Sequence, residues 1–454
     1  MNKTNLAYLL LGVLIGVFGI KSAQESWSIE KETLKRVTSV DLQASVIGTG
    51  GATGGATGGA TGGVTEGVTG GKISTAQDTA KSADLSSSNN DVAKQAAQTI
   101  NSSNIGGTAN GTDIQDFVRH EKVVIAMKIH GEPFLPEVKQ ALCLLHAAYN
   151  SRVLYDIVIF HTTPLPEADM AVVQAIVHPA KVTFVMDEKT LEQQIEDMTP
   201  EQREKLVARC NDANTTADLS WHTRCVDGKT VMPIAYCWMS EFRSKQIWRQ
   251  KVLEPYKYML WWDSDNFATM VWQQDPIDYM VREDLVLLMG NYGQGTTRGG
   301  SGVQKKLYQV YNKTLCKSKI VENGRLHATY GTTEQECGGR DVKQVHGFFH
   351  ITNLDFYRLP INLHWYDVEI GDNKFSRQWD DQLAVMVPPV MLAPERAVEM
   401  EDVGIRPDIM HNSMTMGKRK WKGGAYLAFW EREAPTKFPE AIEKCTPYIE
   451  SPGR

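Results

Sequence analysis

The sequence predicts an α/β fold built on a mainly parallel sheet, because apolar strands alternate with helical segments. Strand-like runs lie at 123–127, 155–160 and 182–185. Between the first two lies a segment, 136–150, whose apolar residues recur at helical spacing. The chain has 454 residues, 42% of them hydrophobic and 22% charged, which is enough to build a core. Its net charge of −6 gives no reason to expect a nucleic-acid partner.

Four later segments extend this framework. A charged segment at 191–209 and a mixed segment at 233–252 are expected to form helices, and 284–289 to form another strand. Residues 290–340 are rich in glycine and polar side chains. We expect a long excursion there with little regular structure, close to the functional site.

The central strand leads directly into two carboxylates. Residues 258–262 are aromatic and apolar, and Asp263 and Asp265 follow at once. Ligands of open α/β sheets bind outside the carboxyl ends of the strands. Two carboxylates there can hold a hard divalent cation, which in turn can hold a diphosphate. The alternative is that this Asp-x-Asp only caps a helix or forms a turn.

The N-terminus carries an apolar run of fifteen uncharged residues at 6–20, between Lys3 and Lys21. It is short for a bilayer, which needs about 20 residues. It is either the core of a signal peptide, cleaved near Ser22-Ala23, or an uncleaved signal anchor. We favour the anchor, with residues 1–5 as a short cytosolic tail.

A flexible stem is expected at 21–116. Thr49–Gly71 repeats Thr-Gly-Gly-Ala/Val nearly every four residues, and a Ser/Asn/Ala/Gln-rich stretch follows. Such composition buries too little apolar surface to fold. The globular domain then spans 117–454. An anchor, a stem and a globular domain in this order are the layout of a type II Golgi membrane enzyme with its catalytic domain in the lumen.

The seven cysteines are an odd number, so in an oxidising compartment at least one is free or paired between chains. No Cys-x-x-Cys occurs among them, so their spacing does not indicate a zinc site.

Four downstream segments offer candidate chemistry. In 345–358, a strand is expected to enter a helix with Asn353 as its N-cap, and His350 lies on that strand. Asp381 either caps a helix or faces the cleft and binds a sugar hydroxyl. His411 is either a surface residue or a neutral imidazole ligand for the metal. The basic segment 418–422 is either a solvated tail or a clamp on a diphosphate or acidic glycan.

These segments resemble, in this order, the fungal α-1,2-mannosyltransferases of glycosyltransferase family 15, over about residues 120–412. Asp263-Ser-Asp265 looks like the family's Glu-Pro-Asp, and Tyr236–Ser244 looks like its Tyr-Arg-x-Met-Cys-Arg-Phe-x-Ser. Phe349–Arg358 is similar to Phe-Glu-Ile-Ala-Asp-Leu-x-Phe-Phe-Arg. Gln378–Asp381 is similar to Arg-Trp-Gly-Asp, and Glu401–Gly404 to Asp-Asp-Ile-Gly.

The resemblance implies a GT-A fold, a Mn²⁺ cofactor, GDP-mannose as donor and a glycan or glycoprotein as acceptor. It further implies retaining transfer with an α-1,2 linkage. From the residues and the resemblance together, we expect Asp263, Asp265 and His411 to hold the metal, Tyr236, Ser244 and Asp263 to bind the donor, and Asp381 and His350 to take part in catalysis.

The sequence also departs from that family. His350 stands where the family has the Glu proposed as nucleophile, Cys237 and Glu241 replace two arginines, and 404–407 lacks the family's His. Two alternatives therefore stand beside the first. One is a UDP-sugar galactosyl- or xylosyltransferase like those of family 34, which share the fold and the Asp-x-Asp. The other is a stalked carbohydrate-binding protein without catalysis.

Overall fold

The structure is a computed structural model that describes residues 117–210, 213–227, 230–290, 292–293, 295–299, 302–345, 347–371, 375, 381–411 and 434–448. The expected tail, anchor and stem at 1–116 lie outside the described residues, as does the basic segment 418–422. Within the described ranges, no helix has the length and apolar character needed to cross a membrane.

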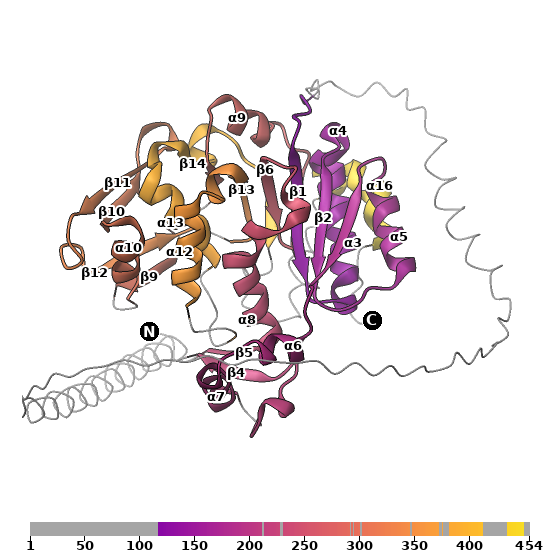
Figure 1. The fold of residues 1–454 in the computed structure, drawn as a ribbon. Helices are drawn as coiled ribbons and strands as arrows, with labels where there is room; N and C mark the ends of the chain where they lie inside the picture. The colour runs from indigo at the N-terminus through magenta and orange to yellow at the C-terminus, as the bar shows by residue number, and fades with distance from the viewer. Residues whose placement is uncertain are drawn as a thin grey trace, which may run out of the picture. The chain divides into compact units, whose positions relative to one another are not determined.

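A seven-stranded sheet forms the centre of the described chain (Figure 1). Its strand order is β14-β8-β13-β6-β1-β2-β3, and of these strands β13 runs antiparallel to both of its neighbours while the other pairings are parallel. The expected mainly parallel α/β sheet is confirmed. The strands are β1 Val123–Ile129, β2 Asp156–His161, β3 Val182–Met186, β6 Tyr258–Trp262, β8 Leu287–Met289, β13 Phe349–Asn353 and β14 Ala397–Glu399.

Both faces of the sheet are covered, so its central strands are mostly apolar, with Lys128 in β1 and His350 in β13 among the buried exceptions. All residues of β1 and β6 are buried. Ile125 and Met127 of β1 belong to one hydrophobic cluster, whereas Val124 and Ala126 belong to the other. This alternation places one half of the core on each face of the sheet.

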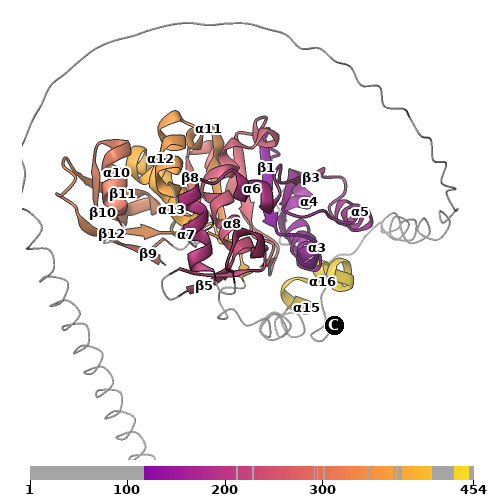
Figure 2. The same ribbon diagram turned by 60° about the horizontal axis from the view of Figure 1, so that its bottom comes forward.

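Different helices supply the two halves of the core. The first face is covered by α3 Leu135–Leu145, α5 Glu167–Ile176, α9 Pro276–Arg282, α15 Ala434–Lys437 and α16 Pro439–Cys445, of which α3, α5 and α16 lie side by side in Figures 1 and 2. The second face is covered by α6 Leu191–Glu196, α7 Pro200–Arg209, α8 Ile234–Glu241, α10 Val303–Tyr311, α11 Leu354–Tyr357, α12 Pro360–Ile370 and α13 Asp381–Leu392. A short helix, α4 Ser151–Val153, precedes β2.

Two expected helices are broken in the structure. The segment 191–209 forms α6 and α7, because Thr199 and Gln202 make a capping box that starts a new helix at Pro200. The segment 233–252 begins as α8 and continues as a π-helical turn, Phe242–Gln246, and two 3₁₀ turns. By contrast, α13 continues through Pro388-Pro389.

The expectation of little regular structure at 290–340 is wrong. This segment contains α10 and two antiparallel strand pairs, on the side of the molecule away from β1–β3 (Figure 1). Its strands are β9 Gly295–Gly299, β10 Thr314–Ile320, β11 Leu326–Gly331 and β12 Gly339–Gln344. The strands β10 and β11 carry polar residues at many positions, so apolar alternation did not reveal them.

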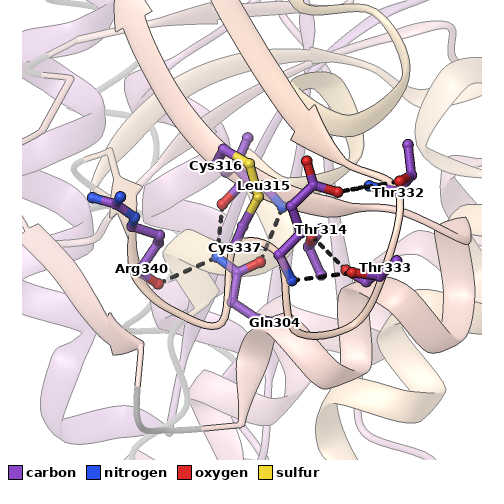
Figure 3. The surroundings of a disulfide bond; sticks show 9 residues. Gln304, Thr314, Leu315, Cys316, Thr332, Thr333, Cys337 and Arg340 are labelled. Atoms are coloured by element: carbon purple, nitrogen blue, oxygen red, sulfur yellow. Dashed lines mark hydrogen bonds between the residues drawn. A yellow bond between two sulfur atoms is a disulfide. The ribbon is translucent and has the colours of Figure 1, made fainter.

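Contacts between distant residues hold this segment together (Figure 3). The buried Gln304 side chain donates to the carbonyls of Leu315 and Arg340 at 2.9 and 3.2 Å and accepts from the Leu315 amide at 3.0 Å. A disulfide joins Cys316 to Cys337. The order of this region therefore comes from side-chain cross-links that no local sequence pattern displays.

Two further disulfides are Cys143–Cys445, which ties α3 to α16, and Cys210–Cys225, which ties the end of α7 to β4 Arg224–Asp227. Cys237 is buried and takes part in none of these disulfides, as expected for an odd number of cysteines. Two short strand pairs complete the fold: β4 with β5 Thr230–Pro233, and β7 Asn266–Ala268 with β15 Ile409–His411.

Candidate functional site

The order of the strands defines where a ligand would bind. From β1 the chain proceeds to β2 and β3 on one side, and later returns as β6 on the other side of β1. Such a reversal opens a crevice outside the carboxyl ends of the two strands beside it. Asp263 is the first residue after β6, so the Asp-x-Asp lies at this switch point.

The fold brings His411 to the two aspartates. The strand β15 pairs with β7 so that His411 lies opposite Asn266, one residue after Asp265. The His411 Nε2 is 3.3 Å from an Asp265 oxygen and 3.7 Å from an Asp263 oxygen. One ligand atom from each of the three residues lies within 4.8 Å of the others. The structure thus places together the three residues predicted as metal ligands.

The electrostatics of this cluster favour a cation. Burial by itself lowers the pKa of His411, but hydrogen bonds and charge from Asp263 and Asp265 outweigh it and raise the pKa to about 9. Carboxylate oxygens suit hard divalent ions such as Mn²⁺ and Mg²⁺, and His411 can complete their shell once its imidazole has released the proton that the two carboxylates stabilise. Within the described ranges, no other group of three His, Cys, Asp or Glu residues has this geometry. The donor set therefore fits Mn²⁺.

Arg243 is a site residue that sequence reasoning missed. It lies in the π-helical turn after α8, and its Nη1 is 2.5 Å from an Asp381 oxygen and 3.5 Å from an Asp263 oxygen. Its guanidinium lies over the Trp261 ring, 4.6 Å from the centroid. Burial raises the pKa of Asp263, but the charge of Arg243 and hydrogen bonds from His411 and Trp261 lower it on balance.

The only sequence signal for Arg243 was its place inside the Tyr236–Ser244 block, at a position that the family motif leaves open. Its π-helical turn is a stronger sign, since such turns are frequent at functional sites.

A tight turn before β13 joins these parts. The Phe348 carbonyl accepts from the Asp263 amide at 3.1 Å and from the Asn266 side chain at 2.7 Å. The Phe348 ring stacks on His411, with centroids 4.4 Å apart. A Cβ on Gly347 would come within 3.0 Å of both Arg243 and Asp381, so a larger residue would displace them. Sequence reasoning singled out neither residue.

The remaining predicted site residues differ in their access to the crevice. Tyr236 is 43% exposed on α8, and its charge interaction with Arg243 shows that it lies nearby. Asp381 begins α13 and pairs with Arg243. Ser244 is buried, and its hydroxyl donates to the Ser240 carbonyl of its own helix at 2.8 Å. This contact accounts for Ser244 structurally and gives no support to the donor-binding role predicted for it.

His350 is buried beneath the site, opposite Trp261 in the β13–β6 register. Burial and then the positive charge of Arg243 lower its pKa to about 3, so the imidazole is neutral. Its Nδ1 has no hydrogen-bond partner among the described residues. The structure thus places His350 close enough to Arg243 and Asp263 to feel their charges, and its catalytic role stays a prediction.

Buried polar groups line the carboxyl ends of β1 and β2. Lys128 forms an ion pair with Asp187 at 2.5 Å, and the Trp238 indole donates to the same carboxylate at 2.8 Å. Beside them, His130 Nδ1 and Thr162 Oγ1 are buried and lack hydrogen-bond partners among the residues described. Buried polar atoms are normally paired, so these two mark where a ligand could bind.

A pocket of about 440 Å³ opens on the other side of the aspartates. It is lined by Gly290 after β8, by Phe348 and Phe349, and by residues of the segment 400–409. The ring of Phe348 is shared between this pocket and His411.

Comparison with known proteins gives structural likeness only. No family profile matches the chain, and a search of curated proteins found no match. Core-mannan synthase A from Aspergillus fumigatus, in a manganese and GDP form, is 15% identical with a TM-score of 0.47, covering 68% of this chain and 82% of that one.

The mannosyltransferase Ktr4p from S. cerevisiae, in complex with GDP, is 12% identical with a TM-score of 0.46 over 73% of this chain and 82% of that one. The galactosyltransferase LgtC, with donor and acceptor sugar analogues, is 10% identical with a TM-score of 0.35 over 73% and 98%. Because all these TM-scores are below 0.5, we base the proposed function on the residues of the site.

Proposed function

We propose that this protein is a glycosyltransferase that uses a nucleotide-diphosphate sugar and a divalent cation. The observation that carries the proposal is the position of Asp263, Asp265 and His411 at the topological switch point of the sheet. A cation held there would neutralise the diphosphate leaving group. A metal-ligand cluster at this particular edge is what a diphosphate-binding enzyme of this fold class requires.

The donor nucleotide is proposed to occupy the crevice beyond β1 and β2. His130 and Thr162 offer unpartnered polar atoms to its base or ribose, and Tyr236 offers an exposed aromatic ring. The diphosphate then reaches Asp263 and Asp265 on the far side of β1. The buried Lys128–Asp187 pair fixes this edge of the sheet from below.

Asp381 is proposed to accept the proton of the attacking acceptor hydroxyl. In the reaction, the bond between the anomeric carbon and the diphosphate breaks while a bond to the acceptor oxygen forms. Arg243 holds the Asp381 side chain in place through the 2.5 Å contact. His350 does not supply the negative charge of the family's carboxylate, because its imidazole is neutral.

The resemblance to family 15 favours mannose as the sugar, GDP-mannose as the donor, Mn²⁺ as the cation and retaining α-1,2 transfer to a glycan or glycoprotein. The sequence layout favours a Golgi enzyme with an N-terminal membrane anchor. A UDP-sugar donor is the nearest alternative within the same fold.

A second candidate function is carbohydrate binding without catalysis. Two observations favour it: His350 stands in place of the family's Glu, and Arg243 already neutralises Asp263 and Asp381. Such a protein would bind sugars at the same edge but would release no nucleotide.

The test is nucleotide release by the purified full-length protein from GDP- and UDP-sugars, with Mn²⁺ and with a chelator. Release of GDP from GDP-mannose that depends on Mn²⁺ is the expected result. Release from a UDP-sugar alone would move the donor assignment to the alternative. A folded protein that releases no nucleotide from any donor would favour the binding protein.

A further inference from the structure

The pocket of about 440 Å³ beside Phe348 is lined by none of the residues proposed to hold the cation or the nucleotide. We propose that it is the binding site for the terminal, uncharged sugar of the acceptor. This inference rests on the proposed function and adds to it the place and the chemical class of the second substrate. Its volume falls within the range of about 300–1,000 Å³ that is usual for small-ligand pockets.

The position of the pocket suits a second substrate. The strands β8 and β14 both run parallel to β6, so Gly290 after β8 and Met400 after β14 lie at the same edge of the sheet as Asp263. The donor crevice lies on the opposite side, beyond β1 and β2. The two binding regions therefore flank the aspartates, as two substrates that react at one point require.

One aromatic ring, that of Phe348, lies between the pocket and the candidate metal ligand His411. Phe348 lines the pocket and stacks on His411, with centroids 4.4 Å apart. His411 in turn lies 3.3 Å from Asp265. A sugar seated against Phe348 thus lies one ring away from the candidate metal ligands.

The lining of the pocket suits a neutral sugar. Its floor is apolar and aromatic, with Phe349, Met400 and Ile405 almost fully buried. Such a floor packs against the C–H face of a sugar ring. The rim carries three exposed charged residues that can bond to hydroxyl groups, namely Glu401, Arg406 and Asp408.

The net charge of the rim residues favours neutral acceptors over anionic ones. Glu401 and Asp408 are negative and Arg406 alone is positive, so the rim carries a net negative charge. A phosphorylated sugar or a lipid phosphate would be repelled by it. We therefore expect methyl glycosides to bind more tightly than a sugar phosphate.

Gly290 provides a variant that fills the pocket without disturbing its walls. A Cβ built on Gly290 meets no atom within 4 Å, and this glycine is not among those with a positive φ. Gly290→Leu should therefore project into the cavity, and Gly290→Ala should do so to a lesser degree. Neither variant touches the candidate metal ligands.

The experiment measures binding of methyl α-mannoside, methyl β-galactoside and methyl β-xyloside to the full-length protein by saturation-transfer NMR. Mannose 6-phosphate serves as the anionic comparison. We expect at least one methyl glycoside to bind the wild type, and Gly290→Leu to weaken that binding at least tenfold, with Gly290→Ala in between. Unchanged binding in Gly290→Leu, or no binding of any methyl glycoside to the wild type, would overturn the proposal.

A kinetic measurement separates this proposal from the proposed function. Gly290→Leu should raise the KM for the acceptor about tenfold or more and leave acceptor-independent release of nucleotide unchanged. Arg406→Ala should act in the same direction more weakly, whereas Arg282→Ala, at the rim of a separate pocket, should have no effect. Normal transfer by Gly290→Leu refutes the acceptor pocket alone, and absence of nucleotide release from the wild type refutes the proposed function.

Discussion

The two sides of β6 differ in how they accommodate charged side chains. On the side of β1–β3, charge is buried and paired: Lys128 and Asp187 meet at 2.5 Å, and both side chains are almost fully enclosed. On the side of β13, β8 and β14, charge stays exposed at the rim of an open pocket with an apolar floor. This difference supports the proposal that the first side holds the donor and the second side holds the acceptor.

The largest effect should come from Asp265→Asn, which removes a candidate metal ligand after β6, between the proposed donor and acceptor sides. We expect nucleotide release to fall roughly a thousandfold, because stabilisation of a leaving group by a metal contributes several kcal/mol. Asp355→Asn is the matched control, since this exposed aspartate follows β13 at the opposite edge of the sheet. Equal losses in both variants, or none in Asp265→Asn, would remove the metal site from the account.

Arg243→Met should lower the free energy of unfolding by about 3–5 kcal/mol, because it leaves Asp263 and Asp381 partly buried without their cation. Urea denaturation followed by circular dichroism measures this loss. Arg249→Met removes a more exposed ion pair with Asp367 and should cost about 1 kcal/mol or less. Similar losses for the two variants would mean that Arg243 is an ordinary surface residue.

Lys128→Met tests the buried charge on the donor side. Burial lowers the pKa of Lys128 from 10.5 to about 8, so between these pH values the unfolded chain holds a proton that the folded chain has released. The contribution of Lys128 to the free energy of unfolding therefore rises with pH across this window, by up to about 3 kcal/mol. The variant lacks this rise.

The measurement is the difference in unfolding free energy between wild type and Lys128→Met at pH 8, 9 and 10. Lys189→Met, which removes an exposed lysine paired with Asp197, is the matched control. A flat difference for Lys128→Met would show that Lys128 is not buried as a charge.

The smallest effect is expected from Asn353→Ala, on the acceptor side. Asn353 caps α11 by accepting from the amides of Asp355 and Phe356. Its loss should cost about 1 kcal/mol, with Thr199→Ala at the N-cap of α7 as the matched change. A thermal shift too small to detect for Asn353→Ala alone would contradict the cap.

The same division separates what the sequence could predict from what it could not. The strands β1, β2, β3 and β6 follow from continuous apolar runs, and Asn353 as an N-cap follows from local chemistry. The strands β9–β12 depend on Gln304 and the Cys316–Cys337 disulfide, which join residues that are distant in sequence.

Within the site, Asp263 and Asp265 could be predicted because they directly follow a buried strand. The place of His411 depends on the pairing of β15 with β7, which no periodicity displays. Arg243 and Phe348 were missed because their roles arise from a π-helical turn and from a tight turn before β13.

The most direct test of the central claim is the binding of Mn²⁺ itself, followed by the electron paramagnetic resonance signal of the free ion. The wild-type full-length protein, with GDP or UDP present, should bind one Mn²⁺ per chain. The double variant Asp263→Asn/Asp265→Asn should leave the ion free while remaining folded. Equal binding of Mn²⁺ by the two proteins would contradict a cation site at the switch point of the sheet.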